Sequence, residues 1–441
     1  MSVKTEEVEK NQHVIDDISD DNMAMLKAKL QAKKESMPVT IVAKKTRSVR
    51  LGVIGTGQAG SRLAASFHKA GYECVVFNTA SQDLEHIDVP EANKLLLEYG
   101  LGGAAKDLEI GKAAAETHRD AIAELVDSRL GDCHALMLCL SLGGGSGAGS
   151  CETMVDLLSS TGKPVIVMTV LPMSSEDAQT KQNALETLSK LAKEAQNKRI
   201  HNLIVVDNAK IESIYSDVSQ MDFFEVSNKA ITSPIDAFNT FSSLPSSVKA
   251  LDPMEWAKIL TDGGGLSVYG EMDVTNFEEP TAIAEAVIEN LNSGLLSGGF
   301  DLKQSKYVGV MIIAKKSVWD KIPSLAVNYA MSMVGEVCGN PAGIFRGIYT
   351  SEDTPDQVVK VYSFFSGLGL PDSRIQQLKK EAAELAAQNK NKDTERNLNL
   401  KLDTGKDEAT STADKIRAQI AAKKSAFGGL LNNVVQDRRK K

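Results

Sequence analysis

The segment GGGSGAG, from Gly143 to Gly149, places five glycines in seven positions. It follows the apolar run HALMLCLSL (134–142) and precedes SCETMVDLLSSTG (150–162), which has the pattern of a helix. A glycine turn between a strand and a helix presents bare backbone N–H groups, and the positive end of the helix dipole adds to their attraction for anions. This glycine segment (143–149) therefore predicts a phosphate cradle, although the G-K-[ST] ending of a P-loop does not follow it.

A second glycine turn, GTGQAG from Gly55 to Gly60, also lies between a strand-like and a helix-like stretch. It fits G-x-G-x-x-G, a pattern that brings backbone N–H groups and a helix N-terminus onto a pyrophosphate. An NAD site also needs an acid near the end of the next strand for the ribose hydroxyls. The chain has Asn78 there and Asp83 only later, which weakens the NAD interpretation.

A third turn of small residues, from Gly100 to Asp107, lies between these two in the sequence. It could close over a terminal phosphate or be an ordinary loop. Two glycine-rich anion sites in one sheet favour a polyphosphate held from two sides, because a dinucleotide fold needs only the first.

The three turns lie within residues 50–208, where short apolar runs alternate with stretches that have the pattern of amphipathic helices. Such alternation predicts an α/β fold with a parallel sheet covered by helices on both faces, whose ligands bind at the carboxyl ends of the strands. A helix follows over roughly 219–243, and then a smaller unit with strands at 307–314 and 358–368. Beyond Pro371 we expect a solvated helix over 372–392, a polar linker and a basic end.

Composition limits the class of protein. The 441 residues carry a formal net charge of −8, so no strong overall attraction to nucleic acid is expected. Five cysteines without C-x-x-C spacing make zinc and a disulfide framework unlikely and fit a reducing cytoplasm. No apolar run approaches the ~18 residues of a membrane span, and the polar N-terminus does not resemble a secretory signal.

The glycine segment resembles GGGTGTG, the signature of the tubulin/FtsZ family, with Ser146 and Ala148 in place of two threonines. The segments GTGQAGSR, FNTASQD and LGGAA resemble the first three nucleotide loops of that family, and VVDNAK and VSNKAI resemble its guanine-side segments. Order and spacing agree over about 50–370. The segment KVYSFFSGLGLP and the polar, basic-ended tail are most similar to the plasmid and phage TubZ/RepX branch.

The resemblance implies a tubulin/FtsZ-like α/β fold with flexible tails. Its expected parts are an N-terminal extension (1–48), a GTP-binding domain (49–218), a central helix and connection (219–249), a smaller α+β activation domain (250–370), and a C-terminal helix with a basic disordered tail (371–441).

The resemblance also assigns nucleotide-binding residues. Asn228 has an alternative interpretation as a solvated polar residue of its helix. Phosphates would be held by Gly57, Gln58, Ser61 and the glycine segment (Gly143, Gly144, Gly145, Ser146, Gly147, Ala148, Gly149), and the γ-phosphate would be approached by Gly102, Gly103 and Ala104. Further nucleotide-binding residues of the matching loops would be Gly55, Ala59 and Asn78. Glu176 would lie near the ribose, and Asn208 and Asn228 would read the guanine edge.

The segment KALDPMEWAKIL resembles the family's catalytic loop, which contacts the nucleotide of the next subunit. Asp252 and Glu255 match its two acids, while Ala250 replaces the asparagine that the loop often carries. Two carboxylates could orient and polarise a water for attack on the γ-phosphate. The same residues also read as a helix start, with Asp252 as N-cap before Pro253, and the two interpretations are compatible.

The implied function is a cytoplasmic GTPase, without a membrane partner, that uses GTP and Mg²⁺ and polymerises head to tail with copies of itself. No residue is assigned as a metal ligand. Its role would be segregation or positioning of plasmid or phage DNA, with the C-terminal tail as the contact for a DNA-binding adaptor. The alternatives are an NAD-dependent oxidoreductase, resting on Gly55–Gly60, and a non-hydrolysing structural filament, resting on the altered glycine segment and Ala250.

Overall fold

The computed structural model describes residues 46–293 and 299–398. Most of the expected N-terminal extension and the basic tail beyond Leu398 lie outside the described residues. The chain divides into two compact units at Leu385, and the elements up to that residue belong to the first. The predicted domain boundaries inside that unit stay predictions.

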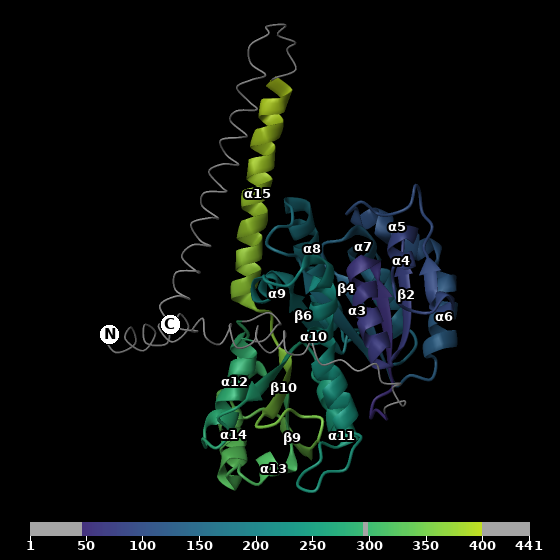
Figure 1. Ribbon diagram of the computed structural model, residues 1–441. Coiled ribbons are helices and arrows are strands. Elements are labelled where there is room, and N and C mark those ends of the chain that lie inside the picture. Colours follow the sequence, from purple (N-terminus) through teal and green to yellow (C-terminus); the bar gives the residue numbers. More distant parts are fainter. Residues whose placement is uncertain (1–45, 294–298, 399–441) are drawn as a thin grey trace. The chain divides into compact units, whose positions relative to one another are not determined.

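The first unit is built on one sheet with the order β3-β2-β1-β4-β5-β6-β7-β10-β8-β9 within the described residues (Figure 1). The strands from β3 to β6 are parallel, which confirms the predicted α/β fold. Nearly all of their residues are buried because helices cover both faces. The parallel strands are β1 (Leu51–Thr56), β2 (Glu73–Asn78), β3 (Lys94–Leu96), β4 (Ala135–Ser141), β5 (Val165–Leu171) and β6 (Asn202–Asp207).

The connections between these strands are helical, as the alternation predicts. The stretch 111–130 has the amphipathic pattern of one helix but forms two, because at His118 the backbone leaves helical geometry (φ −103°, ψ 17°). No glycine or proline marks that break in the sequence. The helices are α3 (Gly57–Ala70), α4 (Ser81–Glu85), α5 (Leu108–Thr117), α6 (Arg119–Leu130), α7 (Gly145–Ser159), α8 (Ala178–Gln196) and α9 (Asn208–Ile214), with a short 3-10 turn, η1 (Glu91–Asn93).

A long helix, α10 (Gln220–Phe241), leads to α11 (Pro253–Thr261) and to the second half of the sheet. Strand β10 runs antiparallel to both β7 and β8, and β7 joins the two halves by pairing in parallel with β6. This half comprises β7 (Leu266–Val274), α12 (Ala282–Ser293), η2 (Leu302–Gln304), β8 (Tyr307–Ala314), α13 (Lys316–Trp319), α14 (Ser324–Val337), β9 (Gly343–Thr350) and β10 (Val359–Leu368).

Strands β8 and β10 match the two strands predicted for this half, whereas β7 and β9 were not predicted. Strand β7 carries Glu271 and Asp273 in its interior, which masks its strand character in the sequence. The two acids share an ion pair with Lys360 of β10, whose Nζ lies 2.7 Å and 2.9 Å from their carboxylates. The sequence does not reveal these ion pairs, because they form only where β7 and β10 lie next to each other in the sheet.

The last described helix, α15 (Asp372–Leu398), is six residues longer than the predicted 372–392. The prediction of a linker starting at Asp393 was therefore wrong for these six residues. None of the described helices is long and apolar enough to cross a membrane.

Candidate nucleotide-binding site

The glycine segment begins a helix rather than forming one continuous loop. Helix α7 starts at Gly145, with Gly144 as its N-cap in extended conformation (φ −79°, ψ 160°). The first N–H groups of a helix have no acceptor within it, so the N-cap Gly144 and the first turn of α7 present N–H groups that can hold an anion.

Several of these glycines are required by packing. A Cβ on Gly145 would lie 2.7 Å from Ala104 Cβ and 2.9 Å from Ala104 O. One on Gly149 would collide with Leu108 O of α5 and lie 3.0 Å from Gly111 Cα. The bare backbone of α7 therefore lets α5 and the turn before it approach closely, which places Ala104 against the start of α7.

The first glycine turn lies beside the same helix start. Gly57 has a positive φ of 69°, and a Cβ there would be 2.9 Å from Gly147 N. Gln58 is exposed and its Nε2 donates a 2.9 Å hydrogen bond to Asp83 Oδ1. Ser61 is fully buried, and among the described residues its hydroxyl has no hydrogen-bond partner. Gly55 and Ala59 complete this turn, with Gly55 buried and Ala59 half-buried.

The turn after β2 ties these two segments together. Thr79 Oγ1 and Ser146 Oγ are 2.6 Å apart, so the serine that replaces a family threonine bonds to the second loop. Asn78 is buried, accepts from Thr79 N and donates to Asp83 Oδ2 at 3.1 Å. Asp83 of α4 thus orients both Gln58 and Asn78. In the sequence Asp83 is notable only as an acid too far along the chain for an NAD ribose, because its pairing role depends on contacts between separate turns.

The third turn (100–107) has five residues with positive φ among its first seven, namely Gly100, Gly102, Gly103, Ala105 and Lys106. Gly103 N donates to Thr79 O at 2.8 Å, and Lys106 Nζ donates to Asp177 Oδ2 at 2.6 Å. The Lys106 hydrogen bond, followed by the backbone N–H of Thr180, lowers the pKa of Asp177 to about 2. The turn is therefore anchored at its middle, by Gly103, and near its end, by Lys106.

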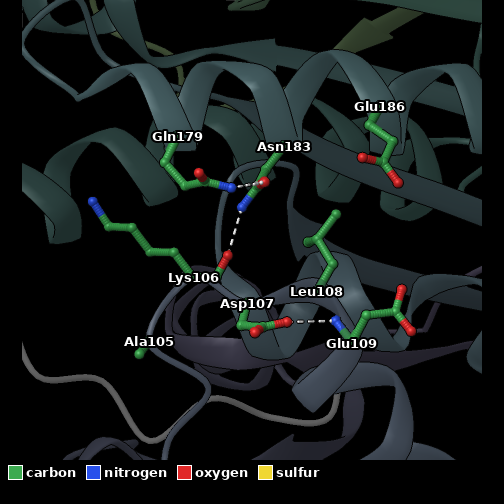
Figure 2. Close-up of a pocket in the computed structure, with 8 residues that line it drawn as sticks. All are labelled: Ala105, Lys106, Asp107, Leu108, Glu109, Gln179, Asn183 and Glu186. Carbon is green, nitrogen blue, oxygen red and sulfur yellow. Dashed lines mark hydrogen bonds between the residues drawn. The ribbon is translucent and has the colours of Figure 1, made fainter. Parts of the chain in front are cut away.

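A hollow of about 470 Å³ lies between this turn, the start of α5 and one face of α8 (Figure 2). Asn183 of α8 spans it, because its Nδ2 donates to Lys106 O at 2.7 Å and to Gly143 O at 3.2 Å. Gln179 supports Asn183 through a 2.9 Å hydrogen bond. Asn183 was not predicted from the sequence, where it is one polar residue on a solvated-looking helix.

The residues predicted for the nucleoside lie on three further elements. Asn228 is half-buried on α10, one turn after the partly exposed Phe224, whose ring lies 4.5 Å from the guanidinium carbon of Arg62 on α3. Asn208 is the first residue of α9, and Glu176 Oε2 accepts from Met173 N within the turn after β5. Phe224 and Arg62 were not predicted, although a large aromatic at i−4 from Asn228 is a usable sequence signal.

Asp252 and Glu255 lie at the start of α11, away from these turns. Met254 N donates to Asp252 Oδ1 at 2.7 Å and Asp252 N donates to Glu255 Oε2 at 2.9 Å, which form the capping box of α11. The other end of α11 contacts the amino end of β6, where Asn202 Nδ2 donates to Leu260 O. The two acids are therefore separated from the turns predicted to hold phosphate, which lie at the carboxyl ends of the strands, and Figure 1 shows α11 at the opposite end from α5.

Two protein-family models match this chain, one in each half of the sheet. The model of the Tubulin/FtsZ family GTPase domain matches residues 50–216, and that of the C-terminal domain of the tubulin-like protein TubZ matches 249–372. Together they cover well over half of the chain. The chain belongs to the tubulin/FtsZ family.

Individual relatives agree with this family assignment. The chain is 23% identical to Tubulin-like protein TubZ of Bacillus cereus over 353 residues, covering 74% of this chain and 80% of that protein. It is 24% identical to Tubulin-like protein CetZ of Pyrococcus horikoshii, covering 73% and 86%. The match of the C-terminal half to a TubZ domain places the chain in the TubZ-like branch of the tubulin/FtsZ family.

Solved structures show the same fold. A GTPγS-form protofilament of Bacillus thuringiensis serovar israelensis TubZ superposes with a TM-score of 0.71 at 22% identity, covering 80% of this chain and 96% of that one. CetZ2 of Haloferax volcanii, a GTPγS-bound protofilament, gives a TM-score of 0.61 at 22% identity, with coverage of 77% and 99%. The tubulin/FtsZ assignment leaves no support for the NAD-dependent oxidoreductase, which rested on Gly55–Gly60 alone.

Proposed function

We propose that this chain binds GTP with Mg²⁺ in the cytoplasm, assembles head to tail into filaments and hydrolyses GTP between neighbouring subunits. The observation that carries the proposal is the joining of three glycine-containing turns at the start of α7. The bonds Thr79–Ser146 and Gly103–Thr79 and the approach of Gly57 to Gly147 bring backbone N–H groups from separate turns around one point. That arrangement suits a polyphosphate, whose several oxygens each need a donor.

The nucleoside end has a matching polar and aromatic surface. Phe224 offers an apolar face for stacking a base, and Asn228 and Asn208 offer amides that can both donate and accept. A guanine edge presents a carbonyl oxygen beside N–H donors, so amides can pair with it. The segments VVDNAK and VSNKAI, which contain Asn208 and Asn228, resemble the guanine-side segments of the tubulin/FtsZ family, and this supports guanine over adenine.

Hydrolysis needs the acids of α11 from a second subunit. In this proposal Asp252 and Glu255 of one subunit orient a water in line with the γ-phosphate bound by the next, and one carboxylate accepts its proton. Bound Mg²⁺ would neutralise charge on the phosphates. The capping box fixes both carboxylates in the loop, so the helix-start interpretation and the catalytic one describe the same geometry.

The cellular role proposed is movement or segregation of plasmid or phage DNA through an adaptor held by the basic tail. It is supported by the names of related structures, which include a type III plasmid segregation TubZ and a Clostridium botulinum phage c-st TubZ. The tail itself lies outside the described residues.

The test is GTP turnover measured against protein concentration, together with sedimentation in GTP, GDP and GTPγS. We expect turnover per subunit to rise steeply above an assembly threshold, and Asp252→Asn with Glu255→Gln to keep GTP binding and assembly while losing turnover. These replacements can still cap the helix but lack the charges. Normal turnover in dilute, unassembled protein would refute the shared site, and filaments without any turnover would favour the non-hydrolysing alternative.

A further inference from the structure

The first turns of α15 are attached to the nucleotide-binding half by a buried ion pair. Arg374 Nε donates to Asp207 Oδ2 at 2.7 Å and its Nη2 donates to Asp207 Oδ1 at 3.3 Å. Both residues are more than nine-tenths buried. A two-point arginine–carboxylate pair has a fixed geometry, and removing one partner leaves an unpaired buried charge.

Asp207 lies at the junction that presents a predicted base-reading residue. It ends β6, caps α9 by accepting from Ala209 N at 3.2 Å, and directly precedes Asn208. The Arg374 guanidinium therefore determines the orientation of the carboxylate that starts α9. A change in that orientation would move the backbone that carries Asn208.

A second ion pair, between a buried lysine and a partly exposed glutamate, joins α15 to the turn on the ribose side. Lys181 of α8 is almost fully buried, and its Nζ donates to Glu381 Oε2 and to Ser174 O, each at 2.9 Å. Ser174 belongs to the turn after β5 that also carries Glu176. Burial alone would raise the pKa of Glu381, but Lys181 and Arg374 lower it below its ordinary value.

Glu381 also connects the two ion pairs, because its Oε1 lies 3.7 Å from Arg374 Nη1. The result is one chain of charges, Lys181–Glu381–Arg374–Asp207, whose two ends contact the two turns predicted to hold the nucleoside. The phosphate turns described above are held by hydrogen bonds of Thr79, Asn183 and Asp177. Among the described residues none of these three is hydrogen-bonded to α15 itself, although Asn183 shares α8 with Lys181.

We propose that residues 372–385 of α15 are a positioning element for the nucleoside end of the site, acting through this charge chain. The inference rests on the proposed nucleotide binding and adds a route by which the C-terminal segment and the nucleotide affect each other. Docking of the helix would raise affinity for the guanine nucleotide, and by thermodynamic linkage bound nucleotide would strengthen the docking by the same factor.

The test compares Arg374→Ala, Arg374→Lys and Glu381→Gln with Glu384→Gln, which changes an exposed acid on the same helix. GDP and IDP are titrated calorimetrically, because IDP lacks only the 2-amino group of the base. We expect Arg374→Ala to bind GDP about tenfold more weakly, as loss of a charged hydrogen bond implies. Its preference for GDP over IDP should also shrink, with partial recovery in Arg374→Lys. Glu381→Gln should show a smaller loss, and Glu384→Gln none.

Hydrogen exchange of residues 372–385, measured with and without GDP, supplies the reciprocal readout. GDP should slow exchange there in the wild type and not in Arg374→Ala.

An equal loss of GDP and IDP affinity, or exchange that GDP leaves unchanged in the wild type, would overturn the inference. If Arg374→Ala does not fold, Glu381→Gln decides, since it keeps the shape of the side chain. A wild type that binds no guanine nucleotide would instead overturn the proposed function.

Discussion

Gly144 is the position at which phosphate contact can be tested with the least disturbance to packing. A Cβ there would meet only the hydroxyl of Ser141, at 3.0 Å, whereas one on Gly145 would press on Ala104. We therefore predict that Gly144→Ala keeps the fold and lowers GTP affinity by at least about tenfold. Gly145→Ala should also lower the unfolding temperature. Isothermal titration and thermal melts measure the two effects.

The matched control is Gly335→Ala in α14, where the nearest atom to a new Cβ is Ile344 Cδ1 at 3.5 Å. It should leave GTP affinity unchanged and raise stability by about 0.5–1 kcal/mol, as alanine does in a helix interior. Wild-type GTP affinity in a folded Gly144→Ala would refute phosphate binding at this turn.

Asp177 gives the site a predictable response to acid. Because Lys106 lowers its pKa from 3.8 to about 2, its ionised form stabilises the fold above 3.8, and this contribution is lost as the pH falls towards 2. The pair is about half exposed, so the effect should be on the order of 0.5 kcal/mol. Asp177→Asn keeps an acceptor for Thr180 N and should show a flatter decline below pH 3.8. Urea denaturation at several pH values measures this, and identical slopes in both proteins would contradict the prediction.

The residues that sequence analysis missed share a physical cause. Asp83, Asn183 and Arg374 act by hydrogen bonds to turns distant in the chain, and nothing in their local spacing marks them. The glycines were noticed because their frequency is itself unusual. Their packing role against α5 required the structure, since the sequence gives no register between two helices.

Among the elements, α10 and α11 are joined by one fully buried side chain, Asn239. Its Oδ1 accepts from Val49 N at 2.8 Å and from Trp256 Nε1 at 3.2 Å, and its Nδ2 donates to Val49 O and to Tyr72 Oη. Asn239 thereby links the central helix to the starts of β1 and β2 and to the helix that carries the two acids. Trp256 also stacks on Phe238 of α10, with ring centroids 5.0 Å apart.

We predict that Asn239→Ala lowers the free energy of unfolding by at least about 2 kcal/mol, because several buried partners lose their hydrogen bonds. GTP turnover should fall more than GTP affinity, since α11 would lose its tie to α10. Urea denaturation followed by tryptophan fluorescence gives the first result and filament-stage turnover the second. Asn328→Ala, on the exposed face of α14, is the control, and equal stability of the two variants would contradict the role of Asn239.

The two halves of the sheet differed in how far the sequence could predict them. Strands β1, β2, β4, β5 and β6 are buried on both faces and read as continuous apolar runs, so their number and direction followed from alternation with helices. Strand β7 contains two acids and β9 two glycines and Arg346, so neither shows an apolar run. The antiparallel pairing of β10 between β7 and β8 is a long-range arrangement that no local pattern specifies.

For the whole molecule, the exposed apolar residues at two separate places fit head-to-tail assembly. Leu101 stands fully exposed in the third turn, at the phosphate end, and Met254 is 75% exposed between Asp252 and Glu255. If filaments form as proposed, these two side chains are buried together at each contact, which brings the acids of one subunit to the phosphates of the next. A single charge at either place should then block assembly without affecting nucleotide binding.

We predict that Leu101→Glu and Met254→Glu each bind GTP normally, fail to sediment and have low turnover. Mixing the two variants should restore turnover, because the intact α11 face of Leu101→Glu can meet the intact phosphate face of Met254→Glu in a heterodimer with one complete site. Sedimentation should remain absent in the mixture, since each dimer ends in two blocked faces. Leu325→Glu, which alters a similarly exposed leucine on α14, should assemble and hydrolyse GTP like the wild type. Turnover that stays low in the mixture, while both variants still bind GTP, would show that these two faces do not form the shared site.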